Sequence, residues 1–293
     1  MSRVWIVGPL AWDAVLEVPH LPEAGGFVQG TGLVGRPGGT AANVAVGLAS
    51  SGVSTGFAGY VGDDELSLKL LASLEASQIE KLHIKKLNGA ANHVLILIDA
   101  DGERTIVGLT EDRLDQVTIQ DVILTPEDYV VFVLWRNCFL EDLSFAQNIG
   151  CKIIVGIEAL EEIPQISANI CIGSGSDLRG ELEIERYLQR FDRLVVTHGA
   201  LGADQYWREG SEIKALHQPA IQVDKVIDTT GAGDSFFAGY IKGLVDSRNK
   251  IDDPMLIGAH WSALAVSTPG SQPPDWSTVV TQLPPAINLD DQG

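Results

Sequence analysis

Basic residues are scarce in this chain. Among 293 residues there are 20 lysines and arginines against 39 aspartates and glutamates, which gives a formal net charge of -19 at pH 7. Such a charge repels a phosphate backbone and an anionic membrane surface, so we expect neither nucleic acid nor a membrane as a partner. A nucleotide is not excluded, because backbone amides, a helix N-terminus and a bound cation can all hold phosphates.

Cysteines are few, and long hydrophobic runs are missing. Cys138, Cys151 and Cys171 lack the paired short spacing of a zinc or redox motif, so we expect three buried, reduced thiols. The longest apolar stretch, 129–135, is far shorter than the ~20 residues that a membrane helix needs. No basic region or cleavage signal precedes the strand-like segment Val4–Val7. These features favour a cytoplasmic location.

Two common nucleotide-binding motifs are also absent. No Gly-x-x-x-x-Gly-Lys-Ser/Thr occurs, which removes the kinases that use that phosphate-binding loop. After the first strand the chain reads GPLA, so it does not provide the Gly-x-Gly-x-x-Gly that a dinucleotide-binding oxidoreductase needs there.

Glycine is abundant, with 31 residues, and predicts many tight turns. Short apolar runs of strand length alternate with longer segments of helical period. The runs are Val4–Val7, 152–155, 170–172 and 194–197, and the helical periods cover 184–191 and 237–245. This alternation is typical of a doubly wound α/β fold, in which helices cover both faces of a parallel sheet.

Two regions interrupt this rhythm, 13–36 and 93–107. In the second region, apolar runs flank an Asp-Gly pair at 101–102, which is typical of a β-hairpin. Extra strands in both regions predict a small β lid. We expect one domain over residues 1–284 that carries this lid, followed by a polar, frayed tail over 285–293.

The strongest chemical signal lies at residues 228–240, which read DTTGAGDSFFAGY. The small residues Gly231, Ala232 and Gly233 let backbone N–H groups converge at the start of an amphipathic helix, where its dipole is positive, and so form an anion hole. Asp234 would stand beside a phosphate bound there. That position is unfavourable unless the carboxylate acts on a proton as a general base. The alternative is an acid that only complements the helix dipole, and the surrounding motif makes it the minor reading.

A second signal lies at residues 35–52, which read GRPGGTAANVAVGLASSG. Gly38 and Gly39 expose backbone to a ligand, and the run after them is apolar nearly all round, as in a buried helix. Asn43 is the polar exception. Either neighbouring backbone satisfies its amide, or the amide binds substrate hydroxyls at the helix start. Asn43 alone leaves both alternatives open.

Together these two segments resemble the two signature motifs of the ribokinase-like, or PfkB, carbohydrate kinase family. Further pieces follow in the family's order: Val7-Gly8 with Asp13 after it, the hairpin turn at 101–104, the strand and loop at 195–203, and 263–266 before Pro269-Gly270. The resemblance covers most of the chain. It implies a mostly parallel sheet with helices on both faces and a β lid, and a kinase that transfers the γ-phosphoryl group of ATP to a hydroxymethyl group of a sugar or nucleoside.

The resemblance also implies roles for individual residues. The catalytic base would be Asp234, with the anion hole at Gly231, Ala232 and Gly233. The substrate-binding positions are Asp13, Gly38, Gly39 and Asn43. The nucleotide would be lined by Thr197, Gly199, Gly202 and His260. A monovalent-cation site, for K⁺, matches Asp228, Thr230 and backbone carbonyls near Ala265, Thr268 and Gly270. ATP and Mg²⁺ are the implied cofactors, and a homodimer through the lid is the implied assembly.

The chain departs from the family pattern at three places. Residues 156–160 read GIEAL where members often have Asp-x-Asn-x-Arg. The Asn-x-x-Glu motif that organises Mg²⁺ falls on Ser174 and Asp177, a hydroxyl and a shorter carboxylate. Ala11 replaces an asparagine found in ribose-specific members, which makes ribose a poorer candidate. These changes motivate an alternative, a catalytically weak relative that binds a sugar or nucleotide as a sensor, although an intact Asp234 argues against it.

The expected substrate is a neutral polyhydroxyl compound, because the carboxylate of Asp13 and the amide of Asn43 suit hydroxyl groups. A phosphorylated sugar would need local cations to offset the negative charges. The candidates are Arg36, Arg104 and Arg136.

Overall fold

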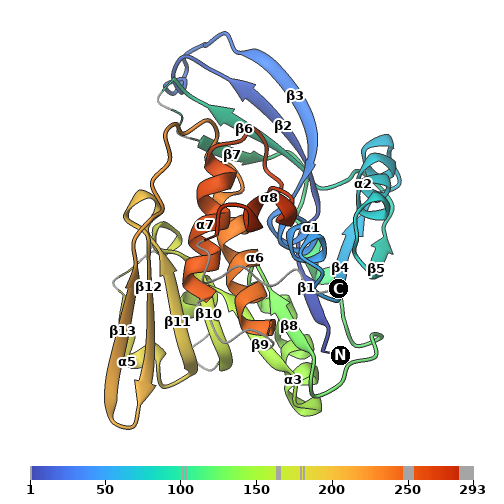
Figure 1. The fold of residues 1–293 in the computed structure, drawn as a ribbon. Coiled ribbons are helices and arrows are strands. Elements are labelled where there is room, and N and C mark those ends of the chain that lie inside the picture. The colour runs from blue at the N-terminus through green and yellow to red at the C-terminus, as the bar shows by residue number, and fades with distance from the viewer. Residues whose placement is uncertain are drawn as a thin grey trace.

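Two β-sheets organise the chain (Figure 1). The computed structural model describes residues 2–100, 102, 104–162, 166–178, 180, 182–246 and 254–283. The strands of the larger sheet are β1 (Val4–Val7), β4 (Thr55–Val61), β5 (Lys81–Lys86), β8 (Tyr129–Phe132), β9 (Lys152–Gly156), β10 (Ala168–Ser174), β11 (Phe191–Thr197), β12 (Ala203–Glu209) and β13 (Glu212–Gln218).

The larger sheet runs in the order β13-β12-β11-β10-β9-β8-β1-β4-β5. Every neighbouring pair from β5 to β11 is parallel, and the antiparallel hairpin of β12 and β13 extends one edge. The carboxyl ends of the parallel strands therefore meet at one edge of the sheet, where ligands bind in open α/β sheets.

The smaller sheet is the lid. It contains β2 (Ala11–Glu17), β3 (Thr31–Gly38), β6 (His93–Ile98) and β7 (Arg104–Gly108), in the order β3-β2-β6-β7. It lies at the top of Figure 1, above the first turn of α6 and the last turn of α7. The predicted hairpin is confirmed, because β6 and β7 pair antiparallel. Positions 101 and 103 of its turn, and the tail 285–293, lie outside the described residues.

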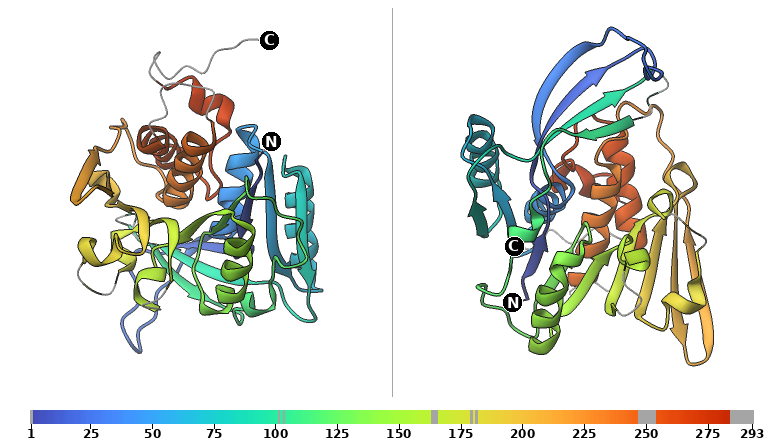
Figure 2. Two further views of the ribbon diagram at one scale, coloured as in Figure 1. Left: turned by 90° about the horizontal axis from the view of Figure 1, so that it is seen from below. Right: turned by 180° about the vertical axis from the view of Figure 1, so that it is seen from behind.

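Helices cover both faces of the larger sheet (Figure 2). The helices are α1 (Thr40–Ser50), α2 (Glu65–Ala76), α3 (Leu140–Ile149), α4 (Ala159–Glu162), α5 (Ile184–Tyr187), α6 (Ala232–Val245), α7 (Pro254–Val266) and α8 (Trp276–Val280). Successive side chains of a strand point to opposite faces, and parallel sheets are buried on both. Val4 and Ile6 accordingly join the core under α1, α6 and α7, whereas Trp5 and Val7 join the core under α3. The doubly wound fold is thus confirmed.

Two details differ from the sequence-based expectations. The predicted helix over 184–191 ends at Tyr187, and Phe191 begins β11. Both side chains enter the same core, so a short helix followed by a strand reproduced a helical spacing of apolar residues. Cys138, expected to be buried, is exposed in a 3₁₀ turn (Asn137–Phe139) that instead turns Phe139 inward.

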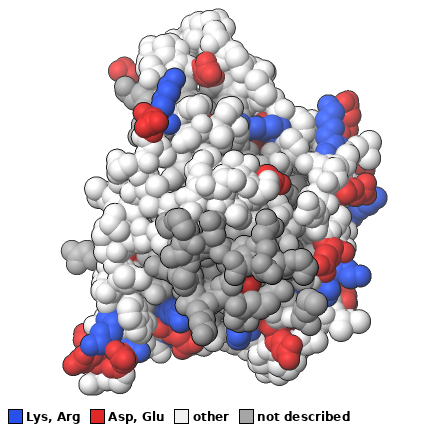
Figure 3. All heavy atoms as spheres, in the orientation of Figure 1, with Lys and Arg blue, Asp and Glu red and all other residues white. Residues whose placement is uncertain are grey.

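Charged side chains on the face drawn in Figure 3 gather in small mixed groups around its rim. Within the part of the chain that is described, none of the helices combines the length and the apolar character that a membrane crossing demands.

Candidate active site

Asp234 lies in the first turn of α6, directly after the glycine that begins the helix. Gly231 is the N-cap and has a left-handed backbone conformation with φ of 76°. A Cβ at this position would overlap the carbonyl group of Ser271, so both the conformation and the close approach require glycine. Gly231 thus places the first N–H groups of α6 beside Asp234, as an anion hole requires, and the N–H of Ala232 donates a hydrogen bond of 3.3 Å to the carbonyl oxygen of Thr229.

Asn43 joins the second sequence motif to the first. It lies on α1, is only 3% exposed, and its Nδ2 donates a hydrogen bond of 2.8 Å to Oδ2 of Asp234. Its Oδ1 is buried and has no hydrogen-bond partner among the described residues. Of the two alternatives that the sequence left open, backbone satisfaction of the amide is therefore wrong. A buried acceptor without a partner is the feature expected where a ligand donates a hydrogen bond.

A second carboxyl group, Asp13, faces the same space. Asp13 is 4% exposed on β2, and Gly38 approaches it so closely that a Cβ there would overlap the carboxylate. Burial raises the pKa of Asp13 to about 6, opposed by the positive Arg36 and by the hydroxyl of Ser271. Burial likewise raises the pKa of the half-buried Asp234 to about 6, opposed by the Asn43 hydrogen bond and by Arg104. The negative Asp13 adds to that rise, so the two carboxyl groups are electrostatically coupled.

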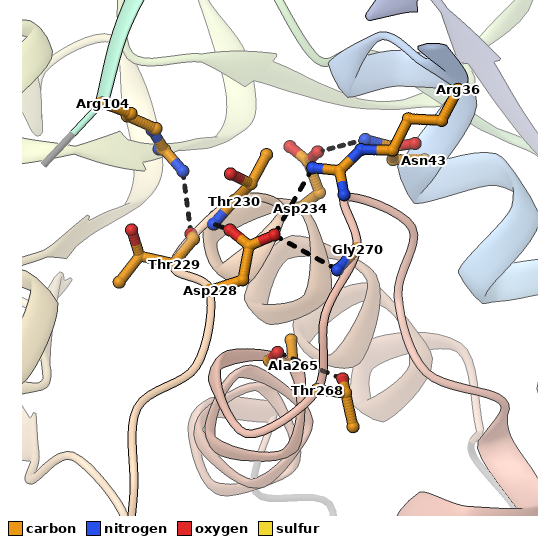
Figure 4. Close-up of polar contacts among 10 residues, drawn as sticks. All are labelled: Arg36, Asn43, Arg104, Asp228, Thr229, Thr230, Asp234, Ala265, Thr268 and Gly270. Carbon is orange, nitrogen blue, oxygen red and sulfur yellow. Dashed lines mark hydrogen bonds and ion pairs between the residues drawn. The ribbon is translucent and has the colours of Figure 1, made fainter. Parts of the chain in front are cut away.

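Asp228 ties together the two loops behind the anion hole (Figure 4). Its Oδ1 accepts a hydrogen bond of 2.8 Å from the backbone N–H of Thr230, and its Oδ2 accepts one of 3.2 Å from the N–H of Gly270. These donors hold the pKa of Asp228 below its ordinary value despite its burial. Ala265 and Thr268 lie at the end of α7 and contact each other, because the carbonyl oxygen of Ala265 accepts hydrogen bonds from the backbone N–H and the hydroxyl of Thr268.

Two arginines of the lid reach the same loop (Figure 4). Arg36 on β3 pairs with Oδ2 of Asp228 at 3.5 Å, and Arg104 on β7 donates a hydrogen bond of 2.8 Å to the carbonyl oxygen of Thr229. Arg36 also lies directly opposite Asp13 in the β2–β3 register, and residues in that relation share one face of the sheet. The lid thus places positive charge between the two carboxylates, Asp13 and Asp228.

The expected nucleotide-lining residues lie on other elements. Thr197 ends β11, and Gly199 and Gly202 follow in the loop that leads to β12. Gly202 has a φ of 100°, and a Cβ there would overlap the carbonyl group of Gln218. His260 is half-buried on α7, where burial lowers the pKa of its imidazole.

Ser174 is the last residue of β10, and Asp177 ends the 3₁₀ turn that follows it. A second carboxylate, which the sequence motifs did not single out, lies nearby. Glu158 follows the neighbouring parallel strand β9, and its Oε2 accepts a hydrogen bond of 3.3 Å from the backbone N–H of Trp135. Burial raises the pKa of Glu158, and the negative Asp177 adds to that rise. One sequence feature could have identified Glu158 as a site residue. It is an acidic residue that closely follows the apolar run of a buried parallel strand, β9.

The structure therefore brings eight of the predicted site residues together in one place. These residues come from four parts of the chain, the lid, the start of α1, the start of α6 and the turn after α7, which contact one another. They are Asp13, Gly38, Asn43, Asp228, Thr230, Gly231, Asp234 and Gly270. Gly39, the N-cap of α1, has a φ of 95° and packs against the backbone of residues 9–11.

Comparison with known proteins agrees with this arrangement. The sequence profile described as "pfkB family carbohydrate kinase" matches residues 1–132 and 175–278. The ribokinase of Bacillus subtilis (strain 168) is 26% identical over 288 residues, covering 93% of this chain and 95% of the relative. The ATP-dependent ribose-1-phosphate kinase of Halopiger xanaduensis is 31% identical over 261 residues, covering 82% and 84%.

A solved structure is similar over nearly the whole chain. The crystal structure of the Methanocaldococcus jannaschii nucleoside kinase, described as an archaeal member of the ribokinase family, matches with a TM-score of 0.71 and 26% identity. The match covers 96% of this chain and 97% of that one. With its signature loop at the start of α6, its lid and these relatives, the chain belongs to the pfkB family of carbohydrate kinases.

Proposed function

We propose that this protein transfers the γ-phosphoryl group of ATP to a hydroxymethyl group of a sugar or nucleoside, with Asp234 as the general base. The observation that carries the proposal is the hydrogen bond between Asn43 and Asp234, at the start of α6 and facing Asp13. It joins the two sequence motifs into one site that offers a base, a substrate-binding carboxylate and an anion hole.

Asp234 suits the role of base. With a pKa of about 6 the carboxyl group is ionised at neutral pH and is still a stronger base than an exposed aspartate. Asn43 fixes its orientation by donating to Oδ2. In the reaction, the substrate hydroxyl oxygen forms a bond to the γ-phosphorus and its proton passes to Asp234. The bond from the γ-phosphorus to the bridging oxygen breaks, and that oxygen keeps the electron pair and leaves with ADP.

The N–H groups at 231–233 would stabilise charge on the phosphoryl group in transfer, because they are fixed in place at the positive end of a helix. The approach to this point is open, since a Cβ at Gly233 would find no atom within 4 Å. The lid strands above it would exclude water, which otherwise competes with the substrate hydroxyl as the nucleophile.

The residues beside β9 and β10 fit Mg²⁺. Glu158, Asp177 and Ser174 offer hard oxygen donors, which this ion prefers, at the ends of two adjacent parallel strands. When bound there, Mg²⁺ would offset the negative charge of the ATP phosphates. In this proposal Glu158 would compensate for the shortened carboxylate and the missing amide of the motif at Ser174 and Asp177.

A neutral substrate is better supported than a phosphorylated one. Each candidate cation already has an oxygen partner: Arg36 pairs with Asp228, Arg104 with the Thr229 carbonyl, and Arg136 with Asp112 at 3.5 Å. The buried carboxylate of Asp13 would also repel a substrate phosphate. The relatives include kinases named for ribose, for nucleosides and for ribose 1-phosphate, so all three substrate classes belong in the test.

The test is a coupled ADP-release screen of the purified protein with ATP and Mg²⁺ over neutral sugars, nucleosides and ribose 1-phosphate. We expect turnover with a neutral compound, and loss of that turnover in Asp13→Ala. If the best substrate is a phosphorylated sugar whose binding survives Asp13→Ala but is abolished by Arg136→Ala, the neutral-substrate proposal is wrong. If no compound releases ADP while sugar or nucleotide binding is seen by calorimetry, the sensor alternative replaces catalysis.

A further inference from the structure

The carboxylate of Asp228 has three donor partners within the chain itself. Oδ1 accepts from the N–H of Thr230 at 2.8 Å, and Oδ2 is shared by the N–H of Gly270 at 3.2 Å and Nη2 of Arg36 at 3.5 Å. The resemblance assigned this residue to a monovalent cation. The carbonyl of Ala265, assigned to the same site, already accepts two hydrogen bonds from Thr268 at 3.1 and 3.2 Å.

This arrangement does not fit K⁺. An alkali cation is held by several oxygen atoms directed at one point, which replace its hydration shell. Here the oxygen atoms of Asp228 are directed at N–H groups and at a guanidinium group, and the carbonyl of Ala265 at Thr268.

The guanidinium group of Arg36 nevertheless supplies a positive charge beside Asp228. The side chains of Arg36 and Asp228 are only 23% and 12% exposed, so salt and water screen their attraction less than that of a surface pair. The planar guanidinium group of an arginine can satisfy more than one oxygen partner. Arg36 lies opposite Asp13 on the lid and reaches Asp228 on the anion-hole loop, so it connects both parts of the site.

The loop that Arg36 contacts is the one that shapes the anion hole. Asp228 joins the segment leading to Gly231 to the segment of Gly270 and Ser271, and the Ser271 carbonyl packs directly on Gly231. A cation at Asp228 therefore fixes the N–H groups that bind the phosphoryl group. Arg104 adds a second link from the lid to the same loop through the carbonyl of Thr229.

We infer that the guanidinium group of Arg36 takes the place of a monovalent cation beside the anion hole, so that phosphoryl transfer by this protein does not require K⁺. Arg36 acts through Asp228 and the loop, and is a positioning residue. The inference rests on the proposed function for its kinetic consequence, but not for its effect on stability. In this arrangement the positive charge beside the anion hole belongs to a side chain of the lid and is not a cation bound from solution.

The experiment compares wild type and Arg36→Gln in KCl and in tetramethylammonium chloride, at a matched ionic strength of about 0.15 M. Wild-type kcat should agree within about twofold between the two salts, a difference of about 0.4 kcal/mol. Arg36→Gln should lose about tenfold in tetramethylammonium, and KCl or millimolar guanidinium should restore part of the loss. A wild-type kcat that falls tenfold without K⁺, or an Arg36→Gln variant indifferent to both cations, would overturn the inference.

Thermal unfolding in the same salts separates this inference from the proposed function. The wild-type Tm should not depend on K⁺, whereas the Tm of Arg36→Gln should rise in KCl, whether or not a substrate is known. Arg3→Gln is the matched control, because it removes a more exposed arginine pair, with Glu80, and should gain no response to K⁺. If Arg36→Gln does not fold, Arg36→Lys keeps the charge and should fold and stay independent of K⁺. A K⁺ requirement in that variant would contradict charge replacement.

Discussion

Asp234 is predicted to be essential for turnover and dispensable for folding. Asp234→Asn keeps the shape of the side chain but removes the proton acceptor, so kcat should fall at least ~10²-fold, the size of general-base effects. Because burial raises the pKa of this carboxyl group to about 6, the charged form is disfavoured in the folded protein. The variant should therefore be at least as stable as wild type in urea unfolding at pH 8. Turnover within threefold of wild type would rule out the assigned role.

The same pKa values predict the pH dependence. The folded pKa values of Asp13 and Asp234, both about 6, lie above the ordinary value of 3.8. The folded state therefore binds these protons more tightly, and their contribution to stability is present below about pH 4 and is lost as the pH rises through about 6. Activity moves in the opposite direction, since kcat/KM should fall as the pH drops through about 6 and the base is protonated. A pH-rate profile checks this, and an acid limb centred near pH 4 would contradict it.

At the scale of single residues, the sequence identified Asp234 and Asn43 but could not connect them. The motif context singled out each residue, whereas their hydrogen bond joins positions 191 residues apart. Arg36 could be named as a cation from the sequence, but its pairing with Asp228 depends on how the lid packs against α6. Glu158 carries no motif signal, because it stands in a segment that departs from the family pattern.

Among the elements, the start of α6 depends most on glycine. Gly231→Ala would place an alanine at φ of 76° and press its Cβ against the Ser271 carbonyl. Left-handed backbone alone costs about 1–2 kcal/mol for a residue other than glycine, so the free energy of unfolding should fall by at least ~2 kcal/mol once the overlap is added. Chemical denaturation measures the effect.

Gly233→Ala is the matched control for that experiment. Gly233 lies in the first turn of the same helix, where a Cβ meets no atom within 4 Å. Alanine is favoured over glycine in a helix by up to ~1 kcal/mol, so the stability of this variant should be unchanged or slightly higher. If both variants lost the same free energy of unfolding, the left-handed backbone and the close approach at Gly231 would not explain the effect.

Helices and strands were predictable where one local pattern dominates, as in β1, the β6–β7 hairpin and α6. The prediction of one helix over 184–191 is wrong. A short helix and the start of a strand lie there, and their apolar residues enter the same core at a spacing that resembles a longer helix. The antiparallel β12–β13 edge was not predicted at all. Many of its side chains are polar and exposed, so it lacked the apolar run that marked the buried strands.

The whole molecule carries a net charge of -19, and ATP is itself an anion. Their repulsion should slow association at low ionic strength and weaken as salt shortens the Debye length to about 10 Å at 0.1 M. We therefore predict that kcat/KM for ATP rises when an inert salt is added from about 0.01 M to about 0.15 M. Initial rates at low ATP concentration provide the measurement, with Mg²⁺ held constant. A fall in kcat/KM would indicate that attraction of ATP by positive side chains near the site is stronger than its repulsion by the net charge.

The position of β1 inside the larger sheet, between β8 and β4, has a consequence for biosynthesis. Val4 pairs with Thr55 on one side and Tyr129 on the other, so β1 leaves the ribosome well over a hundred residues before both of its neighbours exist. The bond between Asn43 and Asp234 forms later still. A nascent chain must therefore keep one side of this apolar strand unpaired while more than a hundred further residues are translated. At roughly 5–20 residues per second this lasts many seconds, during which chaperones have time to bind.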